Sequence, residues 1–171
     1  RPLRYRRLQG PVYHDTMFSS MESVRGYKCG QIYTTDFGWV RFFPMKKKGD
    51  AHFTVDELFH RYGVPTALIS DNARELTQGE FGKKAREARC PIDPVDEYSP
   101  WQNRAESEVR ENKRTVGRWM VESRSPRKVW CFCSELAALV RSHTALNLYQ
   151  LRGQVPETLM TGNTVDISHL C

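Results

Sequence analysis

The chain has 171 residues, and its hydrophobic share of 39%, with four Trp, seven Tyr and eight Phe, indicates one globular domain with a real core. Its formal net charge of +6 and its pI near 9.2 favour a nucleic acid or another anionic partner over a neutral metabolite, the alternative being a solvated basic surface without a partner. No apolar run is long enough for a membrane span, and the arginine-rich start lacks the apolar core of a signal peptide.

The first half of the chain predicts a meander of strands and a helix. Residues 1–10 form a basic lead-in, and strands are expected over VYHDTMF (ending near Asp15), CGQIYTT and WVRFFPM, with a turn at DFG. A helix is expected over residues 51–63, with Phe53, Leu58 and Phe59 on its apolar side and Gly63 as its stop. The short apolar run TALIS then predicts a buried strand whose carboxyl end presents Asp71.

The second half predicts mostly helices. A helix is expected over EFGKKAREAR, followed by an extended piece at PIDPVD and a loop at SPWQN. A long helix is expected over residues 104–122, and a last helix over 127–148. The apolar positions expected on these two helices are Ala105, Val109, Val116 and Met120 on the first, and Trp130, Leu136, Leu139 and Val140 on the second.

This order of elements predicts an α/β fold, with a central sheet flanked by helices on both sides. The five cysteines are an odd number without zinc-binding spacing, so we expect buried thiols in a reducing, intracellular compartment.

Three acidic residues stand out by their contexts: Asp15 in VYHDTMFSS, Asp71 in ALISDNARE and Glu106 in SPWQNRAESEVRENKR. The 34 residues between Asp71 and Glu106 leave room for a strand-end aspartate to meet a helix-borne glutamate. Three converging carboxylates repel one another, and hard cations such as Mg²⁺ or Mn²⁺ are their natural partners. The alternative for Asp15 is Asp36, although TTDFG is more typical of a hairpin turn.

Three segments carry a resemblance to a known family: SDNARELTQGEF, YSPWQNRAESEVRE and VPETLMTGNTVDISHL. They resemble the integrase catalytic core of copia-type long-terminal-repeat retrotransposons, a branch of the retroviral integrase superfamily, from about His14 to the end of the chain. The aliphatic-Arg pair that follows the family's glutamate is matched by Val109 and Arg110, which places the catalytic role on Glu106 and not on Glu108.

The resemblance implies an RNase-H-like fold with a five-stranded mixed sheet, and metal-dependent DNA end processing and strand transfer. Two Mg²⁺ or Mn²⁺ ions would clamp the phosphodiester, with Asp15 bridging both, Asp71 holding one and Glu106 the other. The expected partners are retrotransposon DNA ends, target DNA, further copies of the chain and the flanking domains of the parent polyprotein, with no membrane. A nuclear location follows from the chromosomal target.

A second group of residues is expected to contact DNA without reading its sequence. Arg110, Lys113 and Arg114 follow Glu106 on one helix and would bind backbone phosphates, the alternative being a solvated basic face. For Lys46–Lys48 a solvated turn is favoured over a site, and for His14 a structural role is favoured over metal binding. The full set of predicted nucleic-acid contacts is Asn72, Gln102, Asn103, Arg104, Arg110, Lys113 and Arg114.

The expected organisation is a lead-in over residues 1–10, the integrase core over 11–150 and the start of a post-core linker over 151–171. Two alternatives to the integrase remain open at this point. One is a catalytically inactive remnant that binds DNA or multimerises, and the other is a related RNase-H-like nuclease.

Overall fold

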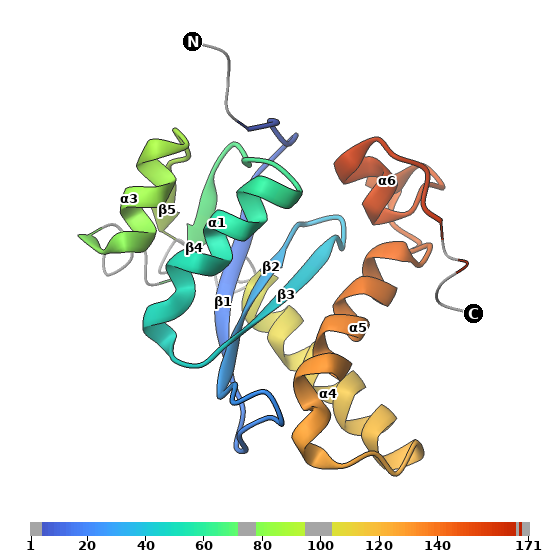
Figure 1. The fold of residues 1–171 in the computed structure, drawn as a ribbon. Coiled ribbons are helices and arrows are strands. Elements are labelled where there is room, and N and C mark those ends of the chain that lie inside the picture. Colours follow the sequence, from blue (N-terminus) through green and yellow to red (C-terminus); the bar gives the residue numbers. More distant parts are fainter. Residues whose placement is uncertain (1–4, 72–77, 95–103, 167, 169–171) are drawn as a thin grey trace.

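A five-stranded mixed sheet forms the centre of the molecule in a computed structural model, which describes residues 5–71, 78–94, 104–166 and 168 (Figure 1). The strand order is β3-β2-β1-β4-β5; β1, β2 and β3 are antiparallel, whereas β4 and β5 run parallel to β1. The sheet and its mixed character confirm the predicted α/β plan. The strand bounds are Val12–Phe18 (β1), Cys29–Thr34 (β2), Val40–Met45 (β3), Leu68–Ser70 (β4) and Ile92–Pro94 (β5).

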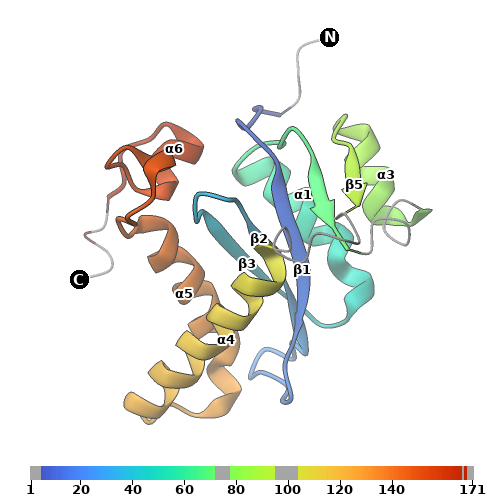
Figure 2. The same ribbon diagram turned by 180° about the vertical axis from the view of Figure 1, so that it is seen from behind.

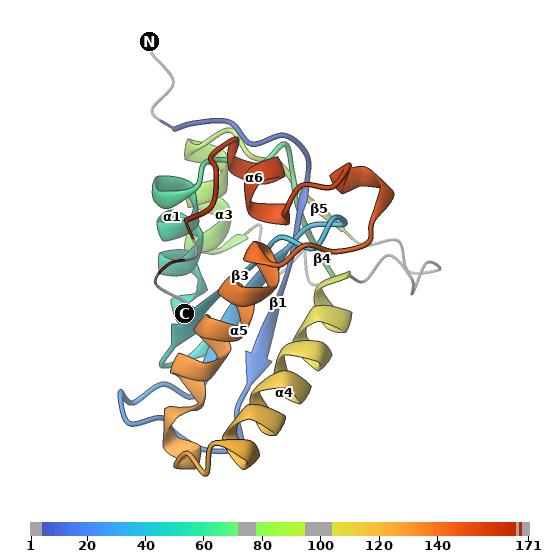
Figure 3. The same ribbon diagram turned by 90° about the vertical axis from the view of Figure 1, so that its right-hand side faces the viewer.

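Helices cover both faces of this sheet, as predicted. Helices α1 and α3 pack against each other on one face, and α4 and α5 pack on the other, as the view from behind and the side view show (Figures 2 and 3). A short helix, α6, follows α5. The helix bounds are Ala51–Arg61 (α1), Glu80–Glu87 (α3), Arg104–Glu122 (α4), Trp130–His143 (α5) and Pro156–Thr161 (α6).

The sequence predicted that strand β1 ends near Asp15. The strand instead continues for three more residues, to Phe18. The extension is stabilised by pairing, because Thr16 lies opposite Gln31 and Phe18 lies opposite Cys29 on β2. Asp15 therefore lies in the middle of the central strand, opposite Ile32.

The side chains of β1 alternate between two hydrophobic cores, one on each face of the sheet. Val12 packs into the core under α1 and α3, whereas Met17 packs into the core under α4 and α5. His14 is buried beside Tyr33 and Phe81, and its Nδ1 accepts a hydrogen bond from Gln31 Nε2 at 2.8 Å. Burial lowers the pKa of His14 to about 3, so the ring is neutral, and its structural role is confirmed.

The predicted apolar faces of α1 and α5 need correction. Phe53 is 65% exposed and Leu136 is 44% exposed, although both were expected to face the core. On α5 the core side is formed largely by small residues such as Ala137 and Ala138, whereas the core side of α1 carries Leu58 and Phe59, as predicted. The buried residues are Ala51, Thr54, Val55, Leu58 and Phe59 on α1, and Trp130, Cys131, Ser134, Ala137, Ala138 and Ser142 on α5.

Helix α4 has the predicted bounds, but its buried stripe is more polar than expected. Ala105 and Val116 are buried as predicted, and Glu108 and Asn112 are buried with them. Three of the cysteines are buried free thiols, Cys133 is partly exposed and Cys171 lies outside the described residues. None of the helices in the described ranges is long and apolar enough to cross a membrane.

Both terminal segments contribute to the same folded unit as the sheet. Leu8 from the lead-in and Leu151 and Met160 from beyond residue 150 are buried in the core under α1. Arg6 donates a hydrogen bond to the backbone oxygen of Thr161 at the end of α6. The segments predicted as a lead-in and a linker are thus packed against the central sheet.

Helix α6 is held to the sheet by a buried acid, Glu157. Its carboxylate accepts a hydrogen bond from Trp39 Nε1 at 2.8 Å and forms a salt bridge with Arg41 on β3. The side chains of Arg41 and Glu157 are only 8% and 14% exposed, so each charge depends on the other.

We therefore expect Glu157→Gln to lower the free energy of unfolding by about 3 kcal/mol, because it leaves the Arg41 guanidinium buried without its counter-charge. Urea unfolding followed by circular dichroism measures this change. The matched control is Glu22→Gln, in the exposed Glu22–Lys28 pair, which should change stability by less than about 0.5 kcal/mol. Equal effects of the two substitutions would show that the buried pair does not hold α6.

Candidate active site

The three acids singled out in the sequence lie on three different elements. Asp15 is in the middle of β1, Asp71 follows the last residue of β4, and Glu106 is in the first turn of α4. The position of Asp71 at the carboxyl end of a short buried strand is as predicted. Residues 72–77 and 95–103, which flank Asp71 and precede Glu106, lie outside the described residues.

The pairing of β1 with β4 brings the two aspartates to the same level of the sheet. Val12 lies opposite Leu68 and Tyr13 opposite Ile69 in a parallel register. Continued for two residues, this register sets Asp71 beside Asp15, on strands about 4.8 Å apart. Asp15 shares its face of β1 with Met17, which packs under α4 and α5, so its carboxylate lies on the face that carries Glu106.

The charges of the three acids interact. Burial raises the pKa of the Asp15 carboxyl, and the negative charges of Asp71 and Glu106 raise it further. The backbone N–H of Thr16, 2.6 Å from Asp15 Oδ1, and the charge of Lys48 act in the opposite direction. The two other acids of the triad therefore both lie within electrostatic reach of the central one.

The carboxylates do not form a ready metal cluster. Within the part of the chain that the structure describes, no group of three or more His, Cys, Asp or Glu residues is arranged to hold a metal ion. Glu106 Oε1 instead lies 3.4 Å from Arg110 Nη2, one helical turn further along α4. The two side chains are 59% and 76% exposed, and an exposed pair of this kind contributes at most about 1 kcal/mol. The Glu106–Arg110 ion pair is therefore weak.

The structure separates Glu106 from its neighbour Glu108. Glu108 is buried between α4 and α5, where its Oε2 lies 3.0 Å from Arg141 Nε. Burial raises the pKa of Glu108, while the positive charge of Arg141 lowers it. Glu108 thus has a structural partner on α5, which leaves Glu106 as the acid that faces the aspartates. The alternative to Asp15, Asp36, is exposed in the turn between β2 and β3.

The basic residues predicted to bind DNA lie on the outer surface of α4. Arg104, Arg110, Lys113 and Arg114 are all exposed, and spacings of four and seven residues set Arg110 and Lys113 on the same side as Glu106. Asn72, Gln102 and Asn103 lie outside the described residues. Lys48 was predicted to be a solvated turn residue, yet its charge acts on Asp15. Only the packing of the chain reveals this, because 32 residues separate the two.

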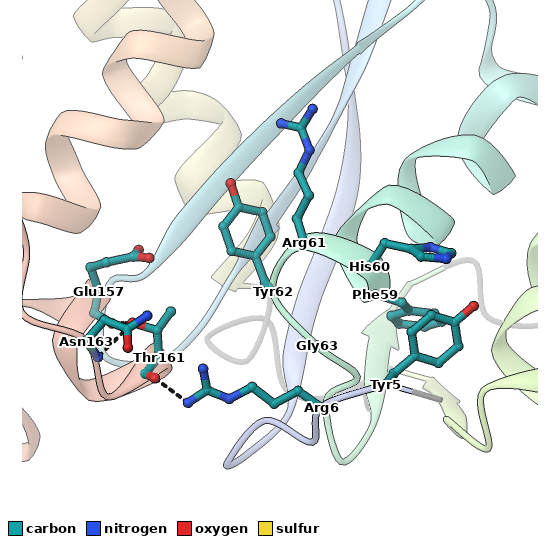
Figure 4. A pocket seen from close by; sticks show the side chains of 10 residues that line it. All are labelled: Tyr5, Arg6, Phe59, His60, Arg61, Tyr62, Gly63, Glu157, Thr161 and Asn163. Atoms are coloured by element: carbon teal, nitrogen blue, oxygen red, sulfur yellow. Dashed lines mark hydrogen bonds between the residues drawn. The ribbon is translucent and has the colours of Figure 1, made fainter. Parts of the chain in front are cut away.

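The pocket shown in Figure 4 is a different feature. It has a volume of about 320 Å³ and lies between the N-terminal segment, the end of α1 and α6. None of the three acids lines it, and two of its charged residues, Arg6 and Glu157, hold α6 in place. The pocket therefore belongs to the packing of the terminal segments.

Comparison with solved structures shows where this fold occurs. The chain is similar to one in the cryo-EM structure of the simian T-cell lymphotropic virus intasome in complex with the PP2A regulatory subunit B56 gamma. The TM-score is 0.67 at 12% sequence identity, over 88% of this chain and 53% of that chain. The likeness shows a shared α/β fold, and the present chain spans about half the length of its counterpart. No protein-family model and no curated protein matches the chain.

The repulsion among the three acids leads to a test that needs no metal. Glu106→Gln removes one of the negative charges that raise the pKa of Asp15, so this pKa should fall, whereas Glu111→Gln on the same helix should leave it unchanged. Titration of the carboxyl carbon of Asp15 by NMR measures both. If the pKa of Asp15 is the same in Glu106→Gln as in the wild type, the two acids do not share a site.

Proposed function

We propose that this chain is the catalytic core of a DNA integrase with an RNase-H-like fold, of the kind found in copia-type retrotransposons. It would process DNA ends and transfer them into target DNA in metal-dependent steps. The observation that carries the proposal is the placement of the three acids: Asp15 on β1 and Asp71 directly after the neighbouring β4, with Glu106 in the first turn of α4. Burial raises the pKa of Asp15, and the charges of Asp71 and Glu106 raise it further, in agreement with this placement. The fold shared with a chain of a viral intasome complex supports it.

The acids fit a hard divalent cation. Their donor atoms are carboxylate oxygens, which Mg²⁺ and Mn²⁺ prefer, and the repulsion among them is what such a cation relieves. In the proposed site Asp15 would bridge two ions, Asp71 would hold one of them and Glu106 the other. When bound, the ions would activate the attacking oxygen and stabilise the leaving oxygen of a phosphodiester.

The helix that carries Glu106 also has the groups to hold the substrate. Arg110 pairs with Glu106 in the structure, and its guanidinium would be available to a phosphate if Glu106 held a metal ion instead. Lys113 follows on the same side of α4. Such contacts supply affinity and orientation without sequence choice, in keeping with the net charge of +6.

A second candidate function is favoured by one observation. The described acids are not arranged in a metal cluster. This is compatible with an inactive integrase remnant that binds DNA or multimerises. Activity and metal binding distinguish the two candidates.

The direct test uses a branched strand-transfer intermediate as the substrate. Its cleavage and rejoining (disintegration) is the reaction that depends least on flanking domains. We expect activity with Mn²⁺ or Mg²⁺ that Glu106→Gln lowers by a factor of about 10³ or more, because a ligand of the catalytic ion is lost. Glu111→Gln, an equal change of charge on α4, should retain activity.

If the wild type shows no disintegration activity, isothermal titration calorimetry of the same proteins with Mn²⁺ distinguishes the possible reasons. Metal binding without activity in the folded wild type would favour the remnant. A wild type that binds no metal would refute the three-carboxylate site, and an active Glu106→Gln variant would refute its role.

The role of the basic side of α4 is tested by salt dependence. Arg110→Ala together with Lys113→Ala removes two predicted phosphate contacts, so the slope of log K against log [salt] for duplex DNA should become shallower by about 1.8. Glu111→Gln with Glu122→Gln, which raises the net charge on the same helix without removing a cation, serves as the control. An unchanged slope in the double alanine variant would show that these residues do not contact DNA.

A further inference from the structure

A small pocket lies further along α4 from the candidate active site. It has a volume of about 330 Å³ and is bounded by the end of β1, α4 and α5. We refer to it as the β1–α4 pocket. Its size is at the lower end of the range of ligand pockets, suited to a single ring system and not to a helix or a folded domain. The residues that matter below are Phe18, Lys113, Val116, Gly117, Trp130 and Ser134.

Gly117 keeps one side of this pocket open. Glycine inside a helix is less stable than alanine by about 1 kcal/mol, so a packing reason is expected for it. No neighbouring atom within the described residues requires a glycine at this position, because a Cβ atom added to Gly117 would meet no atom within 4 Å. A helix position without a side chain allows another molecule to approach the backbone closely.

The floor of the pocket contains an unsatisfied polar atom. Ser134 is 1% exposed, and its hydroxyl has no hydrogen-bond partner within the described part of the chain. A buried polar group in this state is unfavourable unless a ligand supplies the missing hydrogen bond. The pocket therefore suits a ligand that is flat and apolar but has a polar edge.

The walls supply aromatic surface. Trp130 is buried, and its ring is oriented by a hydrogen bond from Nε1 to the backbone oxygen of Met21 at 2.9 Å. Phe18, the last residue of β1, is 55% exposed at the mouth. Exposed aromatic rings of this kind are platforms on which nucleobases stack.

The positive charge of Lys113 at the pocket indicates that the ligand carries an anionic group next to its ring system. Lys113 lines the pocket, and none of the acidic residues in the described part of the chain does. Spacings of seven and eleven residues set Lys113 and Gly117 on the same side of α4 as Glu106, with Gly117 about 16 Å further along the axis. The sugar-phosphate backbone of a DNA strand that passes Glu106 along this side of the helix would reach the pocket within a few nucleotides.

We propose that the β1–α4 pocket binds an unpaired nucleobase of a DNA strand held along α4. The base stacks on Phe18, its polar edge meets the Ser134 hydroxyl, and the adjoining phosphate pairs with Lys113. This inference rests on the DNA binding proposed above and adds a preference for DNA with unpaired ends over fully paired DNA.

The test compares a blunt duplex with the same duplex carrying a short single-stranded overhang, by fluorescence anisotropy at one salt concentration. Wild type should bind the overhang DNA about tenfold more tightly than the blunt DNA, because one base gains a stacking site. Gly117→Leu fills the open side of the pocket and should reduce this ratio to about one, leaving blunt-duplex affinity within about twofold. Gly117→Ala improves the helix equally but leaves most of the space, so it should keep the preference.

Phe18→Ala provides a second variant outside the core, and it should also lose the preference. A wild type that binds both DNAs equally, or a Gly117→Leu variant that keeps the preference, would overturn the base pocket while leaving duplex binding intact. Absence of binding to either DNA would instead overturn the DNA binding on which the inference rests.

Discussion

The parallel pairing of β1 with β4 is the constraint on which the candidate site depends. Parallel strands need a long crossover, and here the chain passes from β3 through α1 before it enters the sheet again beside β1. This path ends with Asp71 directly after β4, next to the level of Asp15. Without this pairing, the two aspartates would not be brought together, since 55 residues lie between them in the sequence.

Helix α4 carries two acids with opposite environments. Glu108 faces α5 and is paired with Arg141, so it orients the first turns of the helix against its neighbour. Glu106, two residues earlier, lies on the exposed side, where Arg110 neutralises it and where its charge reaches Asp15. Because each residue turns a helix by about 100°, Glu106 and Glu108 lie about 200° apart around the axis of α4, so one is exposed and the other is buried.

The terminal segments make tertiary contacts that neither composition nor resemblance indicated. Residues 1–10 were predicted as a basic lead-in from their composition, and residues 151–171 as the start of a post-core linker from the family resemblance. Arg6 and Arg41 nevertheless hold α6 through a backbone oxygen and a buried carboxylate. Arg41 is tolerated in a buried position because it has a carboxylate as its acceptor, whereas Arg6 is exposed and donates to a backbone oxygen.

Local sequence determined much of the architecture. Hydrophobic alternation and turn residues predicted the strands of the meander, and a helical period predicted α4 to its ends. The three acids were identified by context, and the exposed position of Glu106 agrees with the choice made over Glu108. These features could be predicted because they depend on patterns within about twenty residues.

Tertiary structure alone decided the rest. Asp15 lies in mid-strand because β2 pairs beyond it, and Phe53 and Leu136 are exposed because other residues form the core sides of α1 and α5. The influence of Lys48 on Asp15, the burial of Glu108 and the open side of Gly117 depend on segments distant in sequence. The sequence by itself determined which elements form and which acids they carry. Which groups meet was decided by packing, since burial and charge interaction depend on distances in space that no local pattern encodes.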